Sequence, residues 1–360
     1  MTGPEGQNLR RGWTTGACAM AATKAAYQAL LSGAFPDPVS IILPRGETPS
    51  FPLERQEITE DYALAGIIKD AGDDPDVTHG ALIIVRVSRG TAGTGVAFKA
   101  GIGVGTVTLP GLPVAVGEPA INPRPREMME AVVHEIAERA GVPGDVIIEI
   151  SIPGGEGLAH KTWNPRLGIT GGLSILGTTG IVHPFSCSAW IHAIHRGIDV
   201  ARAAGITHVA GATGSTSEAL VKAHHALPNL ALIDMGDFAG GMLKYIRRHP
   251  VSRVTIAGGF GKMTKLAQGH LDLHSARSQV DFTWLAERVG ELGGTPALTE
   301  RVGQANTAAE VYSLARNSDL DLGTLIAKKA RQTAEHVFRD APIDVDTLVI
   351  DRKGSLIGQA

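Results

Sequence analysis

The second half of the chain alternates short apolar runs with segments of helical periodicity, and this pattern restricts the fold more than any other feature. We predict helices over residues 188–204 and 240–248, a helix that opens at Ser215, and strands over residues 206–210, 230–233 and 253–257. Strands that alternate with helices at this spacing favour a doubly wound parallel sheet. A mostly helical C-terminal segment over residues 281–338 and a last strand over residues 347–350 complete the predicted α/β domain.

The first half mixes helices and strands less regularly. We predict an alanine-rich helix over residues 17–31, a helix over 125–140, and strands over 39–43, 81–87 and 146–152. A chain of 360 residues is longer than one hydrophobic core usually serves. We therefore expect an N-terminal α+β domain over residues 1–160 and an α/β domain over residues 161–360, with a boundary between Ile152 and Gly180.

Composition and charge narrow the class of protein. Apolar residues make up 43% of the chain and charged residues 19%, which is typical of a soluble globular protein. The net charge is −3 and no basic stripe is present, so a nucleic-acid binder is disfavoured. The N-terminus lacks an apolar signal core, and no apolar run approaches the roughly 20 residues that span a bilayer. We expect a cytoplasmic protein without a membrane segment, and leave open whether it forms a homo-oligomer.

The strand over residues 206–210 is followed by a glycine loop that suits a nucleoside. Ligands of open parallel sheets bind beyond the carboxyl ends of the strands, where glycines let them approach the backbone. Asp234 lies 20 positions after Gly214, the spacing at which an acid can bind a ribose hydroxyl. The loop reads G-x-x-G from Gly211, so the full dinucleotide fingerprint is missing. A plain strand–helix turn with a surface carboxylate is the alternative, while Ser215 and Glu218 form a capping-box pattern.

Other segments offer groups that attract anions. Thr14, Thr15 and Gly16 precede the alanine-rich helix, and Thr15 is a suitable N-cap next to free N–H groups. Plain capping is the commoner role of such residues. Arg124, Arg126 and Arg166 lie in long loops rich in Gly and Pro and could bind carboxylates, or could tie those loops to nearby carbonyl groups.

Two patterns resemble known sites and fail on inspection. The run Gly258-Gly259-Phe260-Gly261-Lys262 is not a Walker A sequence, because Ile256 and Met263 stand where Gly and Ser or Thr are required. Lys262 could still contact an anionic substrate. His270 and His274 have metal-ligand spacing on a helix, but the Glu of the zinc-protease motif and a third ligand are missing. We therefore expect no protein-bound metal.

Five separated motifs together resemble one family. Residues 12–19 read G-W-T-T-G-A-C-A, residues 71–78 read A-G-D-D-P-D-V-T, and further blocks follow in the same order at 110–126, 164–180 and 258–275. This set is similar to the cobalt-precorrin-5B C1-methyltransferase family, over roughly residues 9–280. Five ordered motifs are far more specific than any one of them.

The resemblance implies an S-adenosylmethionine-dependent C-methyltransferase of cobalamin biosynthesis that gives (cobalt-)precorrin-6A from a corrin-precursor macrocycle. We expect the first domain to bind substrate. Methyl transfer needs no strict catalytic base, and an acid such as Asp73 or Asp74 could tune ring protonation. The expected donor-binding residues are Gly211, Gly214, Ser215, Asp234, Gly258 and Gly259. The expected residues for the macrocycle carboxylates are Thr14, Thr15, Gly16, Arg124, Arg126, Arg166 and Lys262.

Two alternatives remain open at this stage. A nicotinamide-dependent oxidoreductase could use the same half-sheet, although the missing third glycine argues against it. A non-enzymatic corrinoid-binding protein would need no nucleoside site. Whether the macrocycle carries cobalt when it is methylated is also open.

Overall fold

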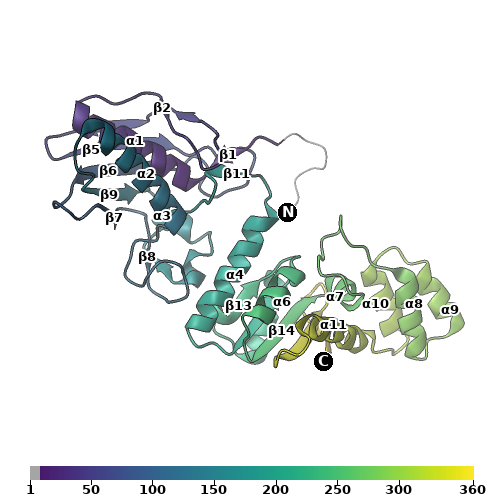
Figure 1. Ribbon diagram of the computed structural model, residues 1–360. Coiled ribbons are helices and arrows are strands. Elements are labelled where there is room, and N and C mark those ends of the chain that lie inside the picture. Colours follow the sequence, from purple (N-terminus) through teal and green to yellow (C-terminus); the bar gives the residue numbers. More distant parts are fainter. Residues whose placement is uncertain (1–8) are drawn as a thin grey trace. The chain divides into compact units, whose positions relative to one another are not determined.

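The computed structural model describes residues 9–360, which form two compact units that divide between Cys187 and Ser188 (Figure 1). This division lies later than the expected boundary at residue 160. The reason is strand pairing: β10 (Ile169–Thr170) pairs with β8 (Thr106–Val107), and β11 (Ile181–Val182) pairs with β1 (Gly12–Trp13). Residues 161–187 therefore belong to the first unit.

The first unit contains a five-stranded sheet. Its order is β4 (Arg55–Ile58), β5 (Tyr62–Ile68), β6 (Leu82–Arg89), β9 (Val146–Ser151) and β7 (Val96–Ala100). Only β7 runs parallel to its neighbour, β9, and the other pairs are antiparallel. A short hairpin of β2 (Val39–Ser40) and β3 (Ser50–Phe51) lies apart from this sheet. The mixed helix and strand content expected of this half is confirmed.

Helices α1 (Thr15–Ser32) and α2 (Pro123–Ala140) pack against each other, and α1 also packs on β5 and β6 (Figure 1). The alanines of α1 are fully buried, because their small side chains let the helix approach its neighbours closely. Both helices end at a glycine in the left-handed region, Gly33 and Gly141, which confirms the predicted end of α2. The short α3 (Gly155–Ala159) follows the sheet.

The second unit contains a mostly parallel five-stranded sheet, as the alternation of elements predicted. Its order is β13 (Leu232–Asp234), β12 (His208–Ala212), β14 (Arg253–Gly259), β15 (Asp344–Ile350) and β16 (Leu356–Gln359). The first four strands are parallel, and β16 is antiparallel to β15. Strand β12 begins two residues later than predicted, at His208.

Helices cover both faces of this sheet. Apolar residues of α4 (Cys187–Ala203), α6 (Ala239–Arg248), α7 (Phe260–Ala267) and α11 (Leu322–Phe338) form one core with one set of strand side chains. On the other face, Val221 of α5 (Ser215–His225) packs with the strand residues Ala210, Leu232 and Leu348. The residues next to these in the strands point to the opposite face and belong to the first core. The predicted helical segment consists of α8 (Phe282–Glu291), α9 (Pro296–Gly303), α10 (Ala308–Arg316) and α11.

The strand order places a change of direction between β12 and β14. From β12 the chain passes through α5 to β13 on one side, and then returns through α6 to β14 on the other side. Helices α5 and α7 start from the carboxyl ends of these two neighbouring strands. In open α/β sheets this is the point at which ligands bind.

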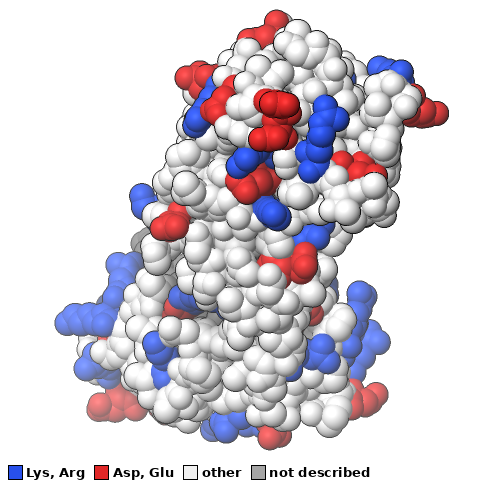
Figure 2. Space-filling view, turned by 90° about the vertical axis from the view of Figure 1, so that its left-hand side faces the viewer, with Lys and Arg blue, Asp and Glu red and all other residues white. Residues whose placement is uncertain are grey.

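The surface shown in Figure 2 intersperses Lys and Arg with Asp and Glu, in keeping with the net charge of −3. Within residues 9–360, no helix combines the length and apolar character needed to cross a membrane.

Candidate functional site

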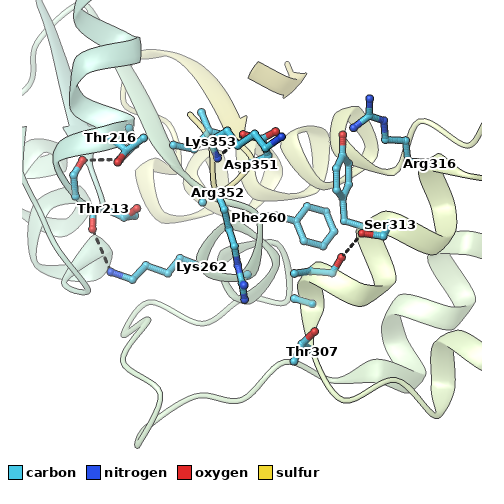
Figure 3. A pocket seen from close by; sticks show the side chains of 18 of the residues that line it. Thr213, Thr216, Phe260, Lys262, Thr307, Ser313, Arg316, Asp351, Arg352 and Lys353 are labelled. Atoms are coloured by element: carbon cyan, nitrogen blue, oxygen red, sulfur yellow. Dashed lines mark hydrogen bonds between the residues drawn. The ribbon is translucent and has the colours of Figure 1, made fainter. Parts of the chain in front are cut away.

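A cavity of about 680 Å³ opens at the point where the strand order changes direction (Figure 3). Four segments line it: residues 213–217 after β12, residues 259–262 after β14, the N-terminal part and one face of α10, and residues 350–353 after β15. Its volume falls in the range of about 300–1,000 Å³ that is usual for small-molecule sites. The predicted residues Gly214, Ser215, Gly259 and Lys262 all lie in its lining.

The four predicted glycines of this sheet edge fall into two pairs. A Cβ atom added at Gly214 or Gly259 would meet no other atom within 4 Å. A Cβ atom at Gly211 would lie 2.4 Å from the Cε atom of Met242, and one at Gly258 would lie 2.8 Å from Thr213 Cγ2. Neighbouring side chains therefore leave no room for a Cβ atom at Gly211 or Gly258. Gly214 and Gly259 leave the backbone accessible from the cavity.

Two helices start at the cavity without a side-chain cap. Gly214 is the N-cap of α5 and Gly259 is the N-cap of α7, and neither helix start has a side-chain capping bond. The predicted capping box is wrong, because Ser215 is the first helical residue and the cap is one residue earlier. The first N–H groups of a helix favour a partner of negative charge. Both helix starts thus present donors at the cavity.

Lys262 lies in the cavity lining but is already paired. Its Nζ atom is 3.0 Å from Asp237 Oδ1 and donates to the carbonyl oxygen of Thr213 at 3.1 Å. These contacts connect the start of α7 with the end of β12 and offset the lysine charge. Contact between Lys262 and a substrate stays a prediction.

The cavity also contains residues that the sequence analysis missed. The rings of Phe260 and Tyr312 have centroids 5.2 Å apart and are inclined by 46°, so they form an aromatic wall. Arg316, Arg352 and Lys353 add positive charge. They come from α10 and from the turn after β15, which are far from the glycine loops in sequence, and no local motif connects them.

Asp234 ends β13 at the same edge of the sheet, where it pairs with Ala212. Its backbone carbonyl accepts a hydrogen bond from Trp190 Nε1 at 3.1 Å. The residues that line the cavity do not include Asp234. The expected contact of Asp234 with a ribose hydroxyl therefore gains no support from this cavity.

In the first unit, three loop segments meet near the start of α1. The N–H of Trp13 donates to the carbonyl of Asp70 at 2.7 Å. Asp73 Oδ2 accepts from the N–H of Arg10 at 2.6 Å, and Asp74 Oδ1 accepts from the N–H of Phe185 at 2.8 Å. Both predicted acids thus hold backbone segments in place, and their effect on ring protonation stays a prediction.

The turn at the start of α1 is buried. The N-cap is Thr14 and not Thr15 as predicted, because Thr14 Oγ1 accepts from the N–H of Ala17 at 3.2 Å. The N–H of Gly16 donates to the carbonyl of Leu176 at 3.1 Å. Two of the N–H groups at this turn are therefore engaged within the protein. A role of these residues in substrate binding stays a prediction.

Comparison with known proteins places the chain in one family. Residues 2–184 match CbiD, and residues 272–360 match the C-terminal domain of CbiD. The chain is 60% identical over 355 residues to the cobalt-precorrin-5B C(1)-methyltransferase of Brucella anthropi, across 99% of this chain and 96% of that protein. The chain belongs to the CbiD family.

A second CbiD relative, the cobalt-precorrin-5B C(1)-methyltransferase of Brucella canis, is 61% identical over 359 residues, across 99% of this chain and 97% of that protein. Among solved structures, the cobalamin biosynthesis protein cbiD from Archaeoglobus fulgidus is 26% identical, with a TM-score of 0.40, and covers 75% of this chain and 83% of that chain.

The three arginines of the CbiD-type loops have partners in the first unit. Arg124 pairs with Glu127 at 2.7 Å. Arg126 donates from Nε to the carbonyl of Ile121 at 2.9 Å and pairs with Glu118 at 3.2 Å, as expected for an arginine that ties its loop to the backbone. The guanidinium of Arg166 lies over the Trp163 ring at 5.1 Å. Their contact with macrocycle carboxylates stays a prediction.

One group in residues 9–360 of this CbiD chain has ligand atoms close enough for a metal: His208, His225 and Asp346, with these atoms within 4.8 Å of one another. The three already form a hydrogen-bonded network. His225 Nε2 lies 2.9 Å from Asp346 Oδ2, and His208 Nε2 lies 2.7 Å from Thr255 Oγ1. Thr255 Oγ1 donates in turn to Asp346 Oδ1 at 2.8 Å. These contacts provide polar partners without an ion.

His270 and His274 would share a helix face only if their segment were helical, and it is not. Helix α7 ends at Ala267, and Gly269 follows in the left-handed region with φ 89°. Residues 270–274 are not helical, so the two histidines do not share a helix face.

Proposed function

We propose that this chain methylates C1 of cobalt-precorrin-5B in cobalamin biosynthesis, with S-adenosylmethionine as the methyl donor. The observation that carries the proposal is the identity of 60–61% over 99% of the chain to relatives with this activity in their names. A relationship this close over nearly the whole length includes the segments that line the cavity.

The donor binds in the cavity of the second unit. Gly214 and Gly259 leave space beside the backbone, and the open start of α5 at Ser215 offers N–H donors to the methionine carboxylate. The rings of Phe260 and Tyr312 offer an apolar face to adenine. We leave Gly211, Gly258 and Asp234 out of this site, because none of them lines the cavity.

Methyl transfer from a sulfonium needs alignment more than activation. The bond between the methyl carbon and sulfur breaks as the bond to C1 forms, and the donor leaves as a neutral thioether. Holding two reactants in line can supply about 7–11 kcal/mol of the barrier reduction. The sulfonium charge disappears in this step, so a poorly solvated site favours it. No covalent enzyme intermediate is required.

Asp73 and Asp74 remain proposed as the acids that tune protonation of the ring. Their carboxylates already accept hydrogen bonds from the N–H groups of Arg10 and Phe185. A catalytic role would be additional to this structural one. Replacing either by Asn keeps an acceptor oxygen and removes the charge, which separates the two roles.

The direct test is to incubate the purified protein with cobalt-precorrin-5B and methyl-labelled S-adenosylmethionine. We expect labelled product by mass spectrometry, and none when the macrocycle is omitted. A protein that binds the macrocycle but leaves the label on the donor would be a corrinoid carrier. A reaction that requires a nicotinamide and transfers no label would support an oxidoreductase.

A further inference from the structure

Three positive side chains line the cavity of the second unit without an ion pair in residues 9–360. They are Arg316 at the end of α10, and Arg352 and Lys353 in the turn after β15, and all three are exposed. Asp351 is the acidic residue of the lining, and its Oδ1 atom accepts from the N–H groups of Lys353 and Ser355 at 2.8 and 2.9 Å. These three cations against one carboxylate leave the cavity with excess positive charge.

Lys262 does not add to this excess, because Asp237 lies 3.0 Å from its Nζ atom. In Figure 3 the side chain of Arg352 crosses the middle of the view between Lys262 and Phe260, while Arg316 lies on the side away from Thr213. The unpaired charge is thus presented at the cavity from the α10 side and from the turn after β15.

The methyl donor does not account for this charge. S-adenosylmethionine has a sulfonium, an ammonium and one carboxylate, so it carries net positive charge near neutral pH. Unpaired cations next to a cationic ligand repel it and weaken its binding. The macrocycle is the opposite kind of ligand, because acetate and propionate carboxylates surround its ring. Arginine binds carboxylates with two parallel hydrogen bonds.

We propose that Arg316, Arg352 and Lys353 bind carboxylates on the rim of the corrin-precursor macrocycle, so that the second unit recognises the substrate as well as the donor. The inference rests on the proposed function. A cavity of about 680 Å³ admits the donor and one carboxylate-bearing edge of the macrocycle rather than the whole ring. The three arginines of the first unit predicted to bind substrate, Arg124, Arg126 and Arg166, already contact an acidic side chain, a backbone carbonyl or an aromatic ring.

The test uses Arg316→Gln, Arg352→Gln and the double variant of the full chain. Arg248→Gln is the matched control, because Arg248 is an exposed arginine at the end of α6 that does not line the cavity. Circular dichroism and the thermal midpoint check that each variant folds. Two quantities are then measured: the macrocycle affinity, from its visible absorption and as KM, and the affinity for S-adenosylhomocysteine, by calorimetry.

We expect each single variant to weaken macrocycle binding about tenfold, and the double variant about a hundredfold, as the loss of charged hydrogen bonds predicts. Affinity for S-adenosylhomocysteine should change less than about twofold. Arg352→Lys should recover part of the loss, since it keeps the charge. Added salt should weaken binding more in the wild type than in the double variant.

Unchanged macrocycle binding in the double variant overturns the inference. It is also overturned if S-adenosylhomocysteine binding falls about tenfold and macrocycle binding does not, because the cations then hold the carboxylate of the donor. Failure of the proposed function is a separate result: the wild type would transfer no methyl group, while macrocycle binding could still be measured without turnover.

Discussion

Lys69 Nζ lies 2.6 Å from Asp76 Oδ2, and the side chain of Lys69 is only 1% exposed. Asp76 Oδ1 accepts from both the N–H and the hydroxyl of Thr78, at 2.7 and 2.6 Å. Burial alone would raise the pKa of Asp76, but Lys69 and Thr78 bind the carboxylate and lower its pKa overall. The loop of residues 70–78 is therefore folded around the buried ammonium group of Lys69.

Lys69→Met should destabilise the protein by about 2–4 kcal/mol, because it leaves the Asp76 carboxylate without its charged partner. We expect a loss of stability towards the lower end of the range for buried ion pairs, because the side chain of Asp76 is 26% exposed. Urea unfolding measures the change. The double variant with Asp76→Asn should recover part of the loss, and full additivity of the two changes would contradict a direct pair.

Arg10→Gln should raise the pKa of Asp70. The guanidinium of Arg10 hydrogen-bonds this carboxylate and, with the N–H of Gly72 at 2.9 Å, holds its pKa at about 2, below its ordinary 3.8. Because the folded-state pKa is depressed, Asp70 contributes stability above about pH 4 and loses it as the pH falls towards 2. NMR titration of the carboxyl carbons should find a value nearer 3.8 in the variant, and no change would remove Arg10 as the cause.

Gly12→Ala should destabilise the first unit by more than about 2 kcal/mol. A Cβ atom at Gly12 would lie 2.0 Å from the carbonyl carbon of Ala71, so two backbone segments would have to separate. Gly157→Ala is the control, since a Cβ there meets nothing within 4 Å in a short helix. Equal thermal midpoints for the two variants would argue against the close backbone crossing.

Gly259→Leu should leave the fold intact and block the cavity. A side chain there enters open space next to Phe260, so we expect affinity for S-adenosylhomocysteine to fall at least about tenfold by calorimetry. Gly303→Leu, at the end of α9 and outside the cavity, should bind normally. Gly211→Ala should instead cost about 1–3 kcal/mol of stability, because its Cβ crowds Met242. Normal binding by the Gly259 variant would mean that the donor binds outside this cavity.

Asp234→Ala should change the affinity for S-adenosylhomocysteine by less than about twofold. Asp234 ends the neighbouring strand β13, and the cavity lining does not reach it. Calorimetry at matched ionic strength checks this. A loss of about tenfold or more would restore Asp234 as the ribose ligand.

The sequence predicted the elements of the second unit well, because its buried parallel strands are continuous apolar runs between helices. In the first unit it missed β5 (Tyr62–Ile68), although this strand is largely buried inside the sheet. It also missed the two edge strands: β4, whose residues Arg55–Ile58 are largely exposed and polar, and β7, which lies in a glycine-rich stretch. An edge strand with solvated side chains has little hydrophobic pattern to detect.

The site was predictable where a local signal exists. The glycine loops at Gly214 and Gly259 follow strands and stood out, whereas Tyr312, Arg316 and Arg352 reach the cavity only through tertiary packing. The capping errors at Thr15 and Ser215 were one residue each. Helix boundaries have this uncertainty when adjacent residues can all act as caps.

The last wall of the cavity consists of Ile350, which ends β15, and residues 351–353. Strand β15 pairs with β14 but follows all of α8–α11 in the sequence. During translation, a ribosome-bound chain can complete its glycine loops early and still lack the turn with Arg352 and Lys353. The proposed site for both ligands is therefore complete only once β15 has paired with β14.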